Sequence, residues 1–188
     1  MSGPVFGSQQ GTMYALEGTV NAGGRLVDQY GLGPTEFPDY DPCPELFCLP
    51  ENAGTGSPHW NPTLPLTFSS KIPATTERDQ CRVVLEGLVF RVCEIIEDLT
   101  EKQAGTNIFL SGGLTKKPFI AKAMASCLDR QVHLLKEKET TLLSVSRLSA
   151  GRSPFSIPIS EPVNPANRYV AGKYMRWKAW AGDLLDTK

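Results

Sequence analysis

The sequence lacks the features that mark a surface for nucleic acid or for a membrane. Its 188 residues carry 19 basic and 20 acidic side chains, so the formal net charge is only −1. Such a balance gives no indication of nucleic-acid or membrane-surface binding. No apolar run reaches transmembrane length, and the first residues lack the basic segment followed by an apolar one that opens a secretory signal. We therefore expect a soluble, cytoplasmic protein.

Histidine is scarce and cysteine is dispersed, which argues against a metal centre. The two histidines, His59 and His133, lie far apart in sequence, and neither a zinc site nor a histidine-based catalytic triad is favoured. The five cysteines show no C-x-x-C spacing and indicate reduced thiols rather than a disulfide framework. These cysteines are Cys43, Cys48, Cys81, Cys93 and Cys127.

A glycine pair between an apolar segment and a helix start is the most informative stretch. Asn107–Leu110 is short, apolar and partly β-branched, as expected of a buried strand. Gly112 and Gly113 follow, and Pro118 fits the first turn of a helix predicted over residues 117–127. Glycine lets a flat ligand approach the main chain, and a helix start presents unpaired N–H groups. The pattern fits a phosphate or nucleotide cradle, but from these residues alone a plain tight turn is the favoured interpretation.

A second glycine pair lies near the N-terminus. Residues 1–11 are rich in glycine, serine and glutamine and predict a frayed lead-in, followed by a strand over Thr12–Glu17. A short helix is predicted over Asn21–Tyr30, and it contains Gly23 and Gly24. Each glycine inside a helix costs about 1 kcal/mol relative to alanine, so something must approach closely. Packing of another helix is the favoured explanation from the residues alone, and a ligand is the alternative.

Strand and helix patterns alternate along the remaining chain and predict a layered α/β domain. Thr76 is expected to cap a long helix whose apolar residues recur every three or four positions, as one core-facing stripe. His59 belongs to a structured loop over residues 50–62, and we expect it to be a packed loop residue. The predicted strands are Leu46–Leu49 and Val132–Leu135, and the predicted helices are Glu77–Lys102, Glu139–Ala150 and a C-terminal helix over 166–186, docked by its aromatic residues.

Several segments, taken in order, resemble the FGGY family of carbohydrate kinases, which includes glycerol kinase and the pentulose kinases. The segment Thr12–Gly24 is similar to the YALEG…AGG sequence that opens the family's C-terminal domain, and Ala53–Pro62 is similar to its GLGAPYWDP loop. Val84–Phe90 resembles the RATLEGIAF helix, Ser111–Phe119 resembles the adenosine segment, and Glu139–Thr141 fits the start of the ETTALGAA helix.

The resemblance implies an actin- and hexokinase-like fold of the RNase H type, with a mixed sheet flanked by helices. In that family the adenine of the nucleotide lies between helices of the C-terminal domain. Carried over residue by residue, Gly113 lies beside the adenine, next to Gly112, and Lys117 takes the place of a family asparagine or serine. Gly24 falls on the second glycine of the AGG segment, and Asp28 falls where glycerol kinase has a glutamine near the nucleotide.

The resemblance also implies which parts of the enzyme lie elsewhere. Residues 1–188 match only the C-terminal half of such a kinase, and no D-x-G-T or D-x-G-S phosphate hairpin occurs in them. Phosphoryl transfer needs positioned phosphates and a carboxylate that accepts the hydroxyl proton. We expect a nucleotide-side domain that binds ATP or ADP, with Mg²⁺ in the complete enzyme, and that is inactive alone, as a fragment or truncated gene product. Its expected partners are the N-terminal kinase domain, a carbohydrate in the full-length enzyme, and a second copy of itself.

Two other classes of function stay open at this point. A non-catalytic nucleotide-binding or regulatory module would keep the same fold without the chemistry. A dinucleotide-binding oxidoreductase is disfavoured, because Gly112 and Gly113 do not form G-x-G-x-x-G and no acidic residue ends a strand about 20 residues later.

Overall fold

The computed structural model describes residues 2–8, 11–21, 23–30, 40–41, 43–51, 53–70, 76–100, 107–136, 140–150 and 159–185. The chain divides into two compact units. The first unit comprises Met1–Gly33, Glu45–Ala104 and Trp177–Lys188, and the second comprises Pro34–Pro44 and Gly105–Arg176.

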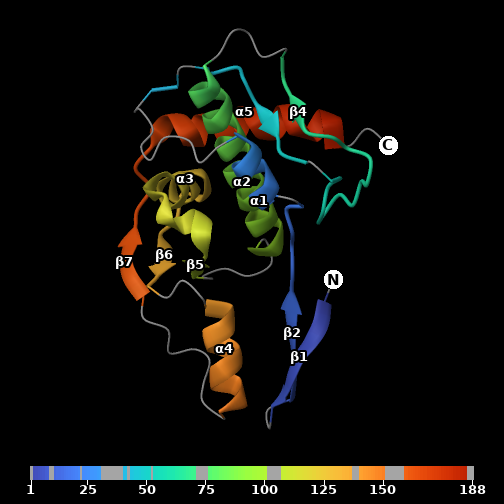
Figure 1. Cartoon of the computed structure of the whole chain (residues 1–188), viewed down its shortest axis with the longest axis vertical. Coiled ribbons are helices and arrows are strands. Elements are labelled where there is room, and N and C mark those ends of the chain that lie inside the picture. The colour runs from blue at the N-terminus through green and yellow to red at the C-terminus, as the bar shows by residue number, and fades with distance from the viewer. Residues whose placement is uncertain are drawn as a thin grey trace. The chain divides into compact units, whose positions relative to one another are not determined.

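Figure 1 labels the helices and strands of both units. The strands are β1 (Ser2–Ser8), β2 (Gly11–Leu16), β3 (Cys48–Leu49), β4 (Thr67–Phe68), β5 (Ile108–Leu110), β6 (Val132–Leu135) and β7 (Ile159–Val163). The helices are α1 (Gly23–Tyr30), α2 (Glu77–Thr100), α3 (Pro118–Leu128), α4 (Thr140–Ser149) and α5 (Arg168–Leu185), with a short 3₁₀ helix, η1 (Gly113–Lys116).

Helix α2 is the centre of the first unit. Thr76 caps it as predicted: the Asp79 N–H donates to Thr76 Oγ1 (3.3 Å), and the Thr76 hydroxyl donates to Asp79 Oδ2 (2.8 Å). Every residue from Cys81 to Arg91 is buried, so the helix is covered on far more of its surface than the single predicted stripe. The expectation was too narrow because α1 and β3 both pack on α2 (Figure 1).

Strand β1 corrects one expectation for the N-terminus. The segment predicted as a frayed lead-in contains a strand, Ser2–Ser8, which pairs antiparallel with β2 from Ser2–Leu16 to Ser8–Gly11. The register shifts between Pro4 and Phe6, as at a β-bulge. Because Pro lacks an N–H and the bulge interrupts the alternation of side chains, the sequence pattern of this strand is weak.

The second unit contains the mixed sheet that the fold class predicted. Strands β5 and β6 run parallel, and β7 pairs antiparallel with β6. Helix α3 packs against β6 and β7 and buries an apolar face that includes Phe119 and Ile120. No strand was predicted at β7, where Pro162 stands opposite His133. Proline is tolerated there because β7 is an edge strand.

Helix α5 contributes residues to both units. In the second unit, Ser126 Oγ accepts hydrogen bonds from the N–H groups of Ala166 (3.2 Å) and Asn167 (3.0 Å), just before the helix starts. In the first unit, the Trp177 indole is fully buried and donates to the Cys48 carbonyl at 2.8 Å. The prediction of a terminal helix docked by its aromatic residues is confirmed.

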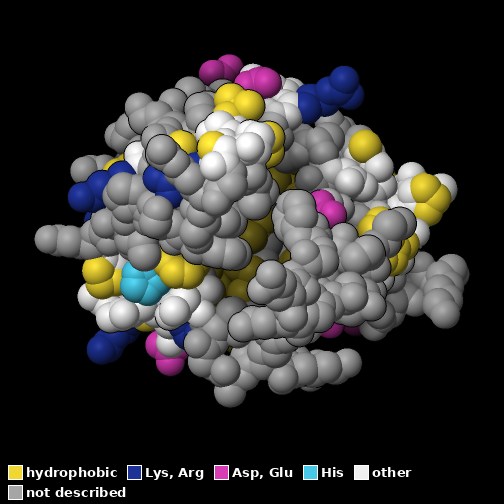
Figure 2. All heavy atoms as spheres, turned by 90° about the horizontal axis from the view of Figure 1, so that it is seen from below, with side chains coloured by type: hydrophobic (Ala, Val, Ile, Leu, Met, Phe, Trp, Pro, Cys, Tyr) yellow, Lys and Arg dark blue, Asp and Glu magenta, His cyan; other side chains and the backbone are white. Residues whose placement is uncertain are grey.

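The surface of the described residues carries both signs of charge. On the face drawn in Figure 2, the coloured Lys and Arg side chains lie among Asp and Glu side chains, and they form no extended patch of one sign. Within the described ranges, no helix is both long enough and apolar enough to span a bilayer.

Candidate functional site

The turn between β5 and α3 is tightly defined by backbone geometry. Gly112 has φ 99° and ψ 179°, a conformation that side chains disfavour, so the fold itself requires glycine at this position. Its carbonyl accepts the Thr115 hydroxyl at 2.7 Å and the Thr115 N–H at 3.3 Å. These two bonds fold residues 113–116 into η1. The chain then continues through Lys117 into Pro118, the first residue of α3.

Gly113 differs from Gly112, because nothing described in the fold requires it. Its φ lies outside the positive range, its surface is exposed, and a Cβ built on it would meet no heavy atom within 4 Å. A Cβ on Gly112 would also face open space. The side chain of Leu114, 36% exposed, lies next in sequence. The turn therefore presents bare main chain and one apolar side chain to the outside.

Lys117 joins η1 to α3. Its N–H donates to the Leu114 carbonyl at 3.1 Å, and its carbonyl accepts from Ile120 at 3.0 Å. The residue is half-buried, and its side chain makes no capping hydrogen bond to the helix. Gly112, Gly113 and Lys117 thus belong to one continuous turn, as their spacing predicted.

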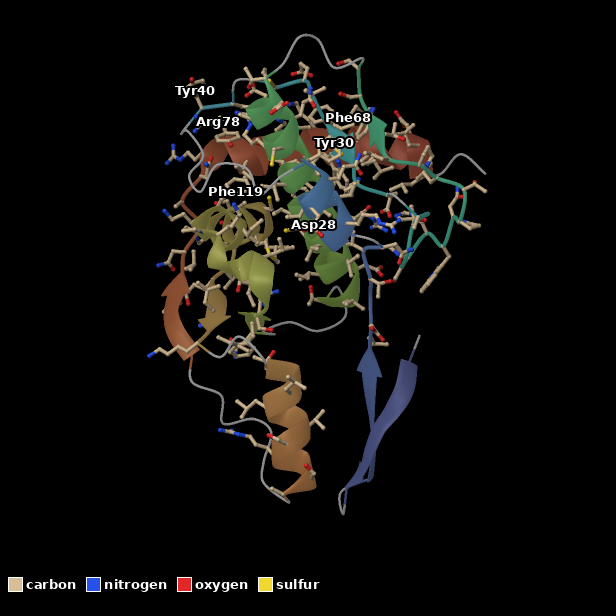
Figure 3. All side chains as sticks on the ribbon, in the orientation of Figure 1. Asp28, Tyr30, Tyr40, Phe68, Arg78 and Phe119 are labelled. Atoms are coloured by element: carbon tan, nitrogen blue, oxygen red, sulfur yellow. The ribbon has the colours of Figure 1, made fainter. Side chains whose placement is uncertain are left out.

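Gly24 and Asp28 lie on α1 in the first unit, and the structure separates the two glycines of that helix. A Cβ on Gly23 would lie 3.3 Å from Leu88 Cδ2 of α2, so Gly23 is explained by helix packing. A Cβ on Gly24 would meet nothing within 4 Å. Gly24 and Asp28 are both exposed, and because they stand four residues apart in the helix they lie on the same side of α1. Figure 3 labels Asp28 on this helix. Their roles at a nucleotide stay predictions.

A buried charged cluster in the first unit was not found from the sequence. Arg91 of α2 is fully buried; its Nε donates to Glu51 Oε1 at 2.8 Å, its Nη2 donates to the Ser57 carbonyl at 2.8 Å, and its Nη1 bonds Glu94 Oε2. His59 Nε2 lies 3.6 Å from Glu94 Oε1. His59 is therefore a partly buried loop residue beside a charge cluster. The available signal was the pair Arg91 and Glu94, which are oppositely charged and three residues apart in a helix.

Burial dominates the electrostatics of this region. The Glu51 side chain is fully buried, and this desolvation raises the pKa of its carboxyl, against the hydrogen bond from Arg91, which lowers it. Burial also raises the pKa of the Cys48 thiol, and the neighbouring Glu51 charge adds to the effect. Cys48 is therefore held as a neutral core thiol. Among the described residues, no three or more His, Cys, Asp and Glu side chains gather as a metal ion would need.

A family model matches most of the chain. Residues 1–145 match the model described as the FGGY family of carbohydrate kinases, C-terminal domain. Relatives include a glycerol kinase of Trichlorobacter lovleyi, 28% identical over 153 residues, which cover 73% of this chain and 30% of the relative. A glycerol kinase of Xanthobacter autotrophicus is 23% identical over 159 residues, covering 77% of this chain and 32% of the relative. The chain thus spans about a third of the length of these curated relatives.

Solved structures share the fold. The glycerol kinase of Plasmodium falciparum, solved with ADP, superimposes with a TM-score of 0.68 at 17% identity over 96% of this chain and 40% of that one. The gluconate kinase of Lactobacillus acidophilus gives a TM-score of 0.61 at 16% identity over 86% of this chain and 34% of that one. The predicted actin- and hexokinase-like fold is confirmed.

Proposed function

Because this chain belongs to the FGGY family of carbohydrate kinases, whose C-terminal domain it matches, we propose that it is the nucleotide-side domain of an ATP-dependent carbohydrate kinase. In this proposal the turn Gly112–Lys117 receives the adenine of ATP or ADP. Gly24 and Asp28 are proposed as further nucleotide contacts on α1, from the family resemblance.

The observation that carries the proposal is the open surface at Gly113. Glycine is needed in a fold where φ is positive or where another group lies close, and neither condition holds at Gly113 among the described residues. A flat ring lying on the main chain would supply the missing reason, because a side chain at that position would occupy the space of the ring. The exposed Leu114 side chain offers apolar surface to the same ring. The residues at the turn therefore fit a nucleobase.

The rest of the proposed reaction needs groups that we do not assign to this chain. Transfer of the γ-phosphate to a sugar or polyol hydroxyl needs a carboxylate base and a phosphate-holding hairpin, and Mg²⁺ neutralises the phosphate charge when bound. We assign no catalytic residue and no Mg²⁺ ligand among the described residues. We propose that an N-terminal kinase domain and the carbohydrate complete the site, in the cytoplasm. The 188-residue polypeptide alone should turn over no ATP with any polyol or ketose.

Titration calorimetry with ADP tests the nucleotide-side role. Replacing Gly113 by valine (Gly113→Val) should weaken ADP binding by at least about tenfold, which corresponds to about 1.4 kcal/mol, while the circular dichroism spectrum stays unchanged. Gly182→Val on α5 is the matched control, because a Cβ on Gly182 also meets nothing within 4 Å. The control should bind ADP as the unsubstituted chain does.

Two results would refute the proposal. One is unchanged ADP affinity in a folded Gly113→Val protein, which would return the glycine pair to a simple strand-to-helix turn. The other is equal weakening in Gly113→Val and Gly182→Val, which would point to a general effect of valine on stability. A coupled assay that detects sugar phosphorylation by the pure 188-residue chain would contradict only its proposed inactivity.

A further inference from the structure

We propose that the loop Gly54–Pro62, which we call the bracing loop, positions the exposed face of α1 that carries Gly24 and Asp28, with Asn21 as the positioning residue between them. The inference rests on the proposed nucleotide contacts of α1. It adds a support that acts on the nucleotide site through the backbone of α1 and not by touching the nucleotide. All these residues belong to the first unit.

The bracing loop is closed on itself. The Thr55 N–H donates to the Asn61 carbonyl at 2.8 Å, and the Asn61 N–H donates to Thr55 Oγ1 at 2.7 Å. Gly54 has φ 74°, and a Cβ built on it would lie 2.6 Å from Pro62 Cα, so the two ends of the loop touch. Hydrogen-bonded and tightly packed groups of this kind carry energetic coupling between the elements that they join.

On one side, the bracing loop is fixed to α2. Arg91 Nη2 donates to the Ser57 carbonyl at 2.8 Å, and the same fully buried guanidinium also bonds Glu51 and Glu94. Displacing Arg91 would leave buried polar and charged groups without partners, which is strongly unfavourable. The loop therefore has a fixed position relative to α2.

On its other side, the bracing loop holds the segment that enters α1. Asn21 Nδ2 donates to the Gly54 carbonyl at 3.1 Å, two residues before α1 begins at Gly23. A Cβ built on Gly56 would collide with the carbonyl oxygen of Thr19, so the loop backbone lies directly against this segment. The start of α1 is thus tied through the loop to Arg91.

Helix α1 depends on such support because it is short. It has eight residues, and Leu26 and Val27 are the ones that it buries. An isolated helix needs about 12–15 residues to be even marginally stable in water. The orientation of Gly24 and Asp28 therefore depends on what holds the start of the helix. Binding groups must be held within about 0.5 Å of their productive positions, so loosening Asn21 should weaken nucleotide binding.

Calorimetry with ADP and the full 188-residue chain tests the inference. Asn21→Ala removes the bond to the Gly54 carbonyl and should raise the Kd for ADP by about fivefold or more, although residue 21 does not touch the nucleotide in this proposal. In the Gly24→Ala background the same substitution should raise the Kd by a smaller factor, because the contact that Asn21 positions is already disturbed.

Thr76→Ala is the matched control for a general loss of stability. It removes the cap of α2 in the same unit, fifteen residues before Arg91, or about 22 Å along the helix at about 1.5 Å per residue. Thr76→Ala should lower the midpoint of urea unfolding, as Asn21→Ala does, and should leave the Kd for ADP unchanged.

Hydrogen exchange gives a second measurement, which needs no substitution. Coupling between two sites is reciprocal, so ADP should slow the exchange of the Thr55 and Asn61 amide hydrogens in the unsubstituted chain. The comparison with Asn21→Ala is made at equal ratios of free ADP to Kd, so that the general stabilisation by the ligand is the same in both proteins. The slowing at the two amides should be smaller in Asn21→Ala.

Four results would overturn the inference. They are a Kd in Asn21→Ala within about twofold of the unsubstituted value, an equal loss of affinity in Thr76→Ala, equal slowing at the two amides with and without Asn21, and no slowing in the unsubstituted chain. The last result decides the matter if Asn21→Ala does not fold. Weakened ADP binding in Gly113→Val, in the second unit, would leave the proposed function standing in each case. A chain that binds no ADP would overturn both.

Discussion

Removal of Arg91 should strongly weaken the first unit. Its guanidinium has no exposed surface and joins three separate acceptors: Glu51 beyond β3, the Ser57 carbonyl in the following loop, and Glu94 on its own helix. The perturbation is Arg91→Leu, which keeps a large apolar stem and removes all the donors. The Glu51 carboxylate, also fully buried, then loses its partner.

The expected loss of unfolding free energy depends on the buried groups that Arg91 leaves without a partner. Removing one member of a buried ion pair costs about 3–5 kcal/mol, because the other charge stays buried without compensation. The Ser57 carbonyl loses its 2.8 Å bond as well, whereas Glu94, with 23% of its side chain exposed, can turn to water. The double variant Arg91→Leu/Glu51→Leu contains no unpaired Glu51 charge. Its loss of unfolding free energy should therefore be only about 1–3 kcal/mol, which reflects the unpaired Ser57 carbonyl and imperfect packing.

Tryptophan fluorescence during urea unfolding measures the stability of the first unit, which contains Arg91. The three tryptophans, Trp60, Trp177 and Trp180, all lie in the first unit, so the fluorescence transition reports its unfolding. Arg78→Leu is the control: Arg78 is an exposed arginine in the first turn of the same helix (Figure 3). Surface substitutions of this kind usually change the unfolding free energy by less than about 0.5 kcal/mol.

Two outcomes would refute this reasoning. If Arg91→Leu is as mild as Arg78→Leu, the buried bonds of Arg91 contribute no net stability. The single variant Glu51→Leu completes the comparison. If the double variant loses as much unfolding free energy as Arg91→Leu and Glu51→Leu together, Glu51 and Arg91 are energetically independent in spite of their 2.8 Å contact.

Three further predictions concern single side chains. Folding raises the pKa of the Glu51 carboxyl, so the contribution of this group to stability is complete below its unfolded pKa, about 4.3, and is lost as the pH rises through the folded pKa. Over that rise in pH, the unfolding free energy of Glu51→Gln should increase relative to that of the unsubstituted chain. A difference between the two proteins that stays constant with pH would contradict this. Gly87→Ala should destabilise the first unit by about 1–3 kcal/mol in urea unfolding, because the new Cβ would lie 2.5 Å from the Cys48 carbonyl oxygen; an unchanged midpoint would show that β3 can move away. Gly24→Ala should instead raise the unfolding free energy by about 0.5–1 kcal/mol, since the helix gains alanine in open space, and it should weaken ADP binding if Gly24 touches the nucleotide.

Local signals predicted the helices well. The Thr76–Asp79 cap fixed the start of α2, and Pro118 fixed the start of α3, because each acts on its own backbone within one turn. Strands were harder to predict. Strand β7 contains Pro162 and exists through its pairing with β6, about 30 residues earlier, and β1 is a glycine-containing strand interrupted by a bulge. Their stability depends on partners that no local pattern displays.

The charge cluster was hidden from sequence reasoning for a related reason. Arg91 has apolar neighbours on both sides in α2, and they suggest an ordinary core stripe. The partners that justify its burial, Glu51 and Ser57, lie 40 and 34 residues away. A charge is buried at low energetic cost only when such partners pair with it. The residue type alone therefore could not indicate whether Arg91 pointed inward or to solvent.

The glycines show where physical reasoning adds to a family resemblance. A fold can require glycine because φ is positive, as at Gly112, or because a neighbouring group lies close, as Leu88 does at Gly23. Once these requirements are assigned, Gly24, Gly113 and Gly182 are left without a structural reason among the described residues, since a Cβ on each meets open space. The resemblance placed the first two of these beside the nucleotide, by aligning motifs and without any knowledge of the space around them, and it gave Gly182 no role. Sterics and motif matching are independent routes, and their agreement on these two positions is why Gly113→Val and Gly24→Ala are the informative substitutions for nucleotide binding.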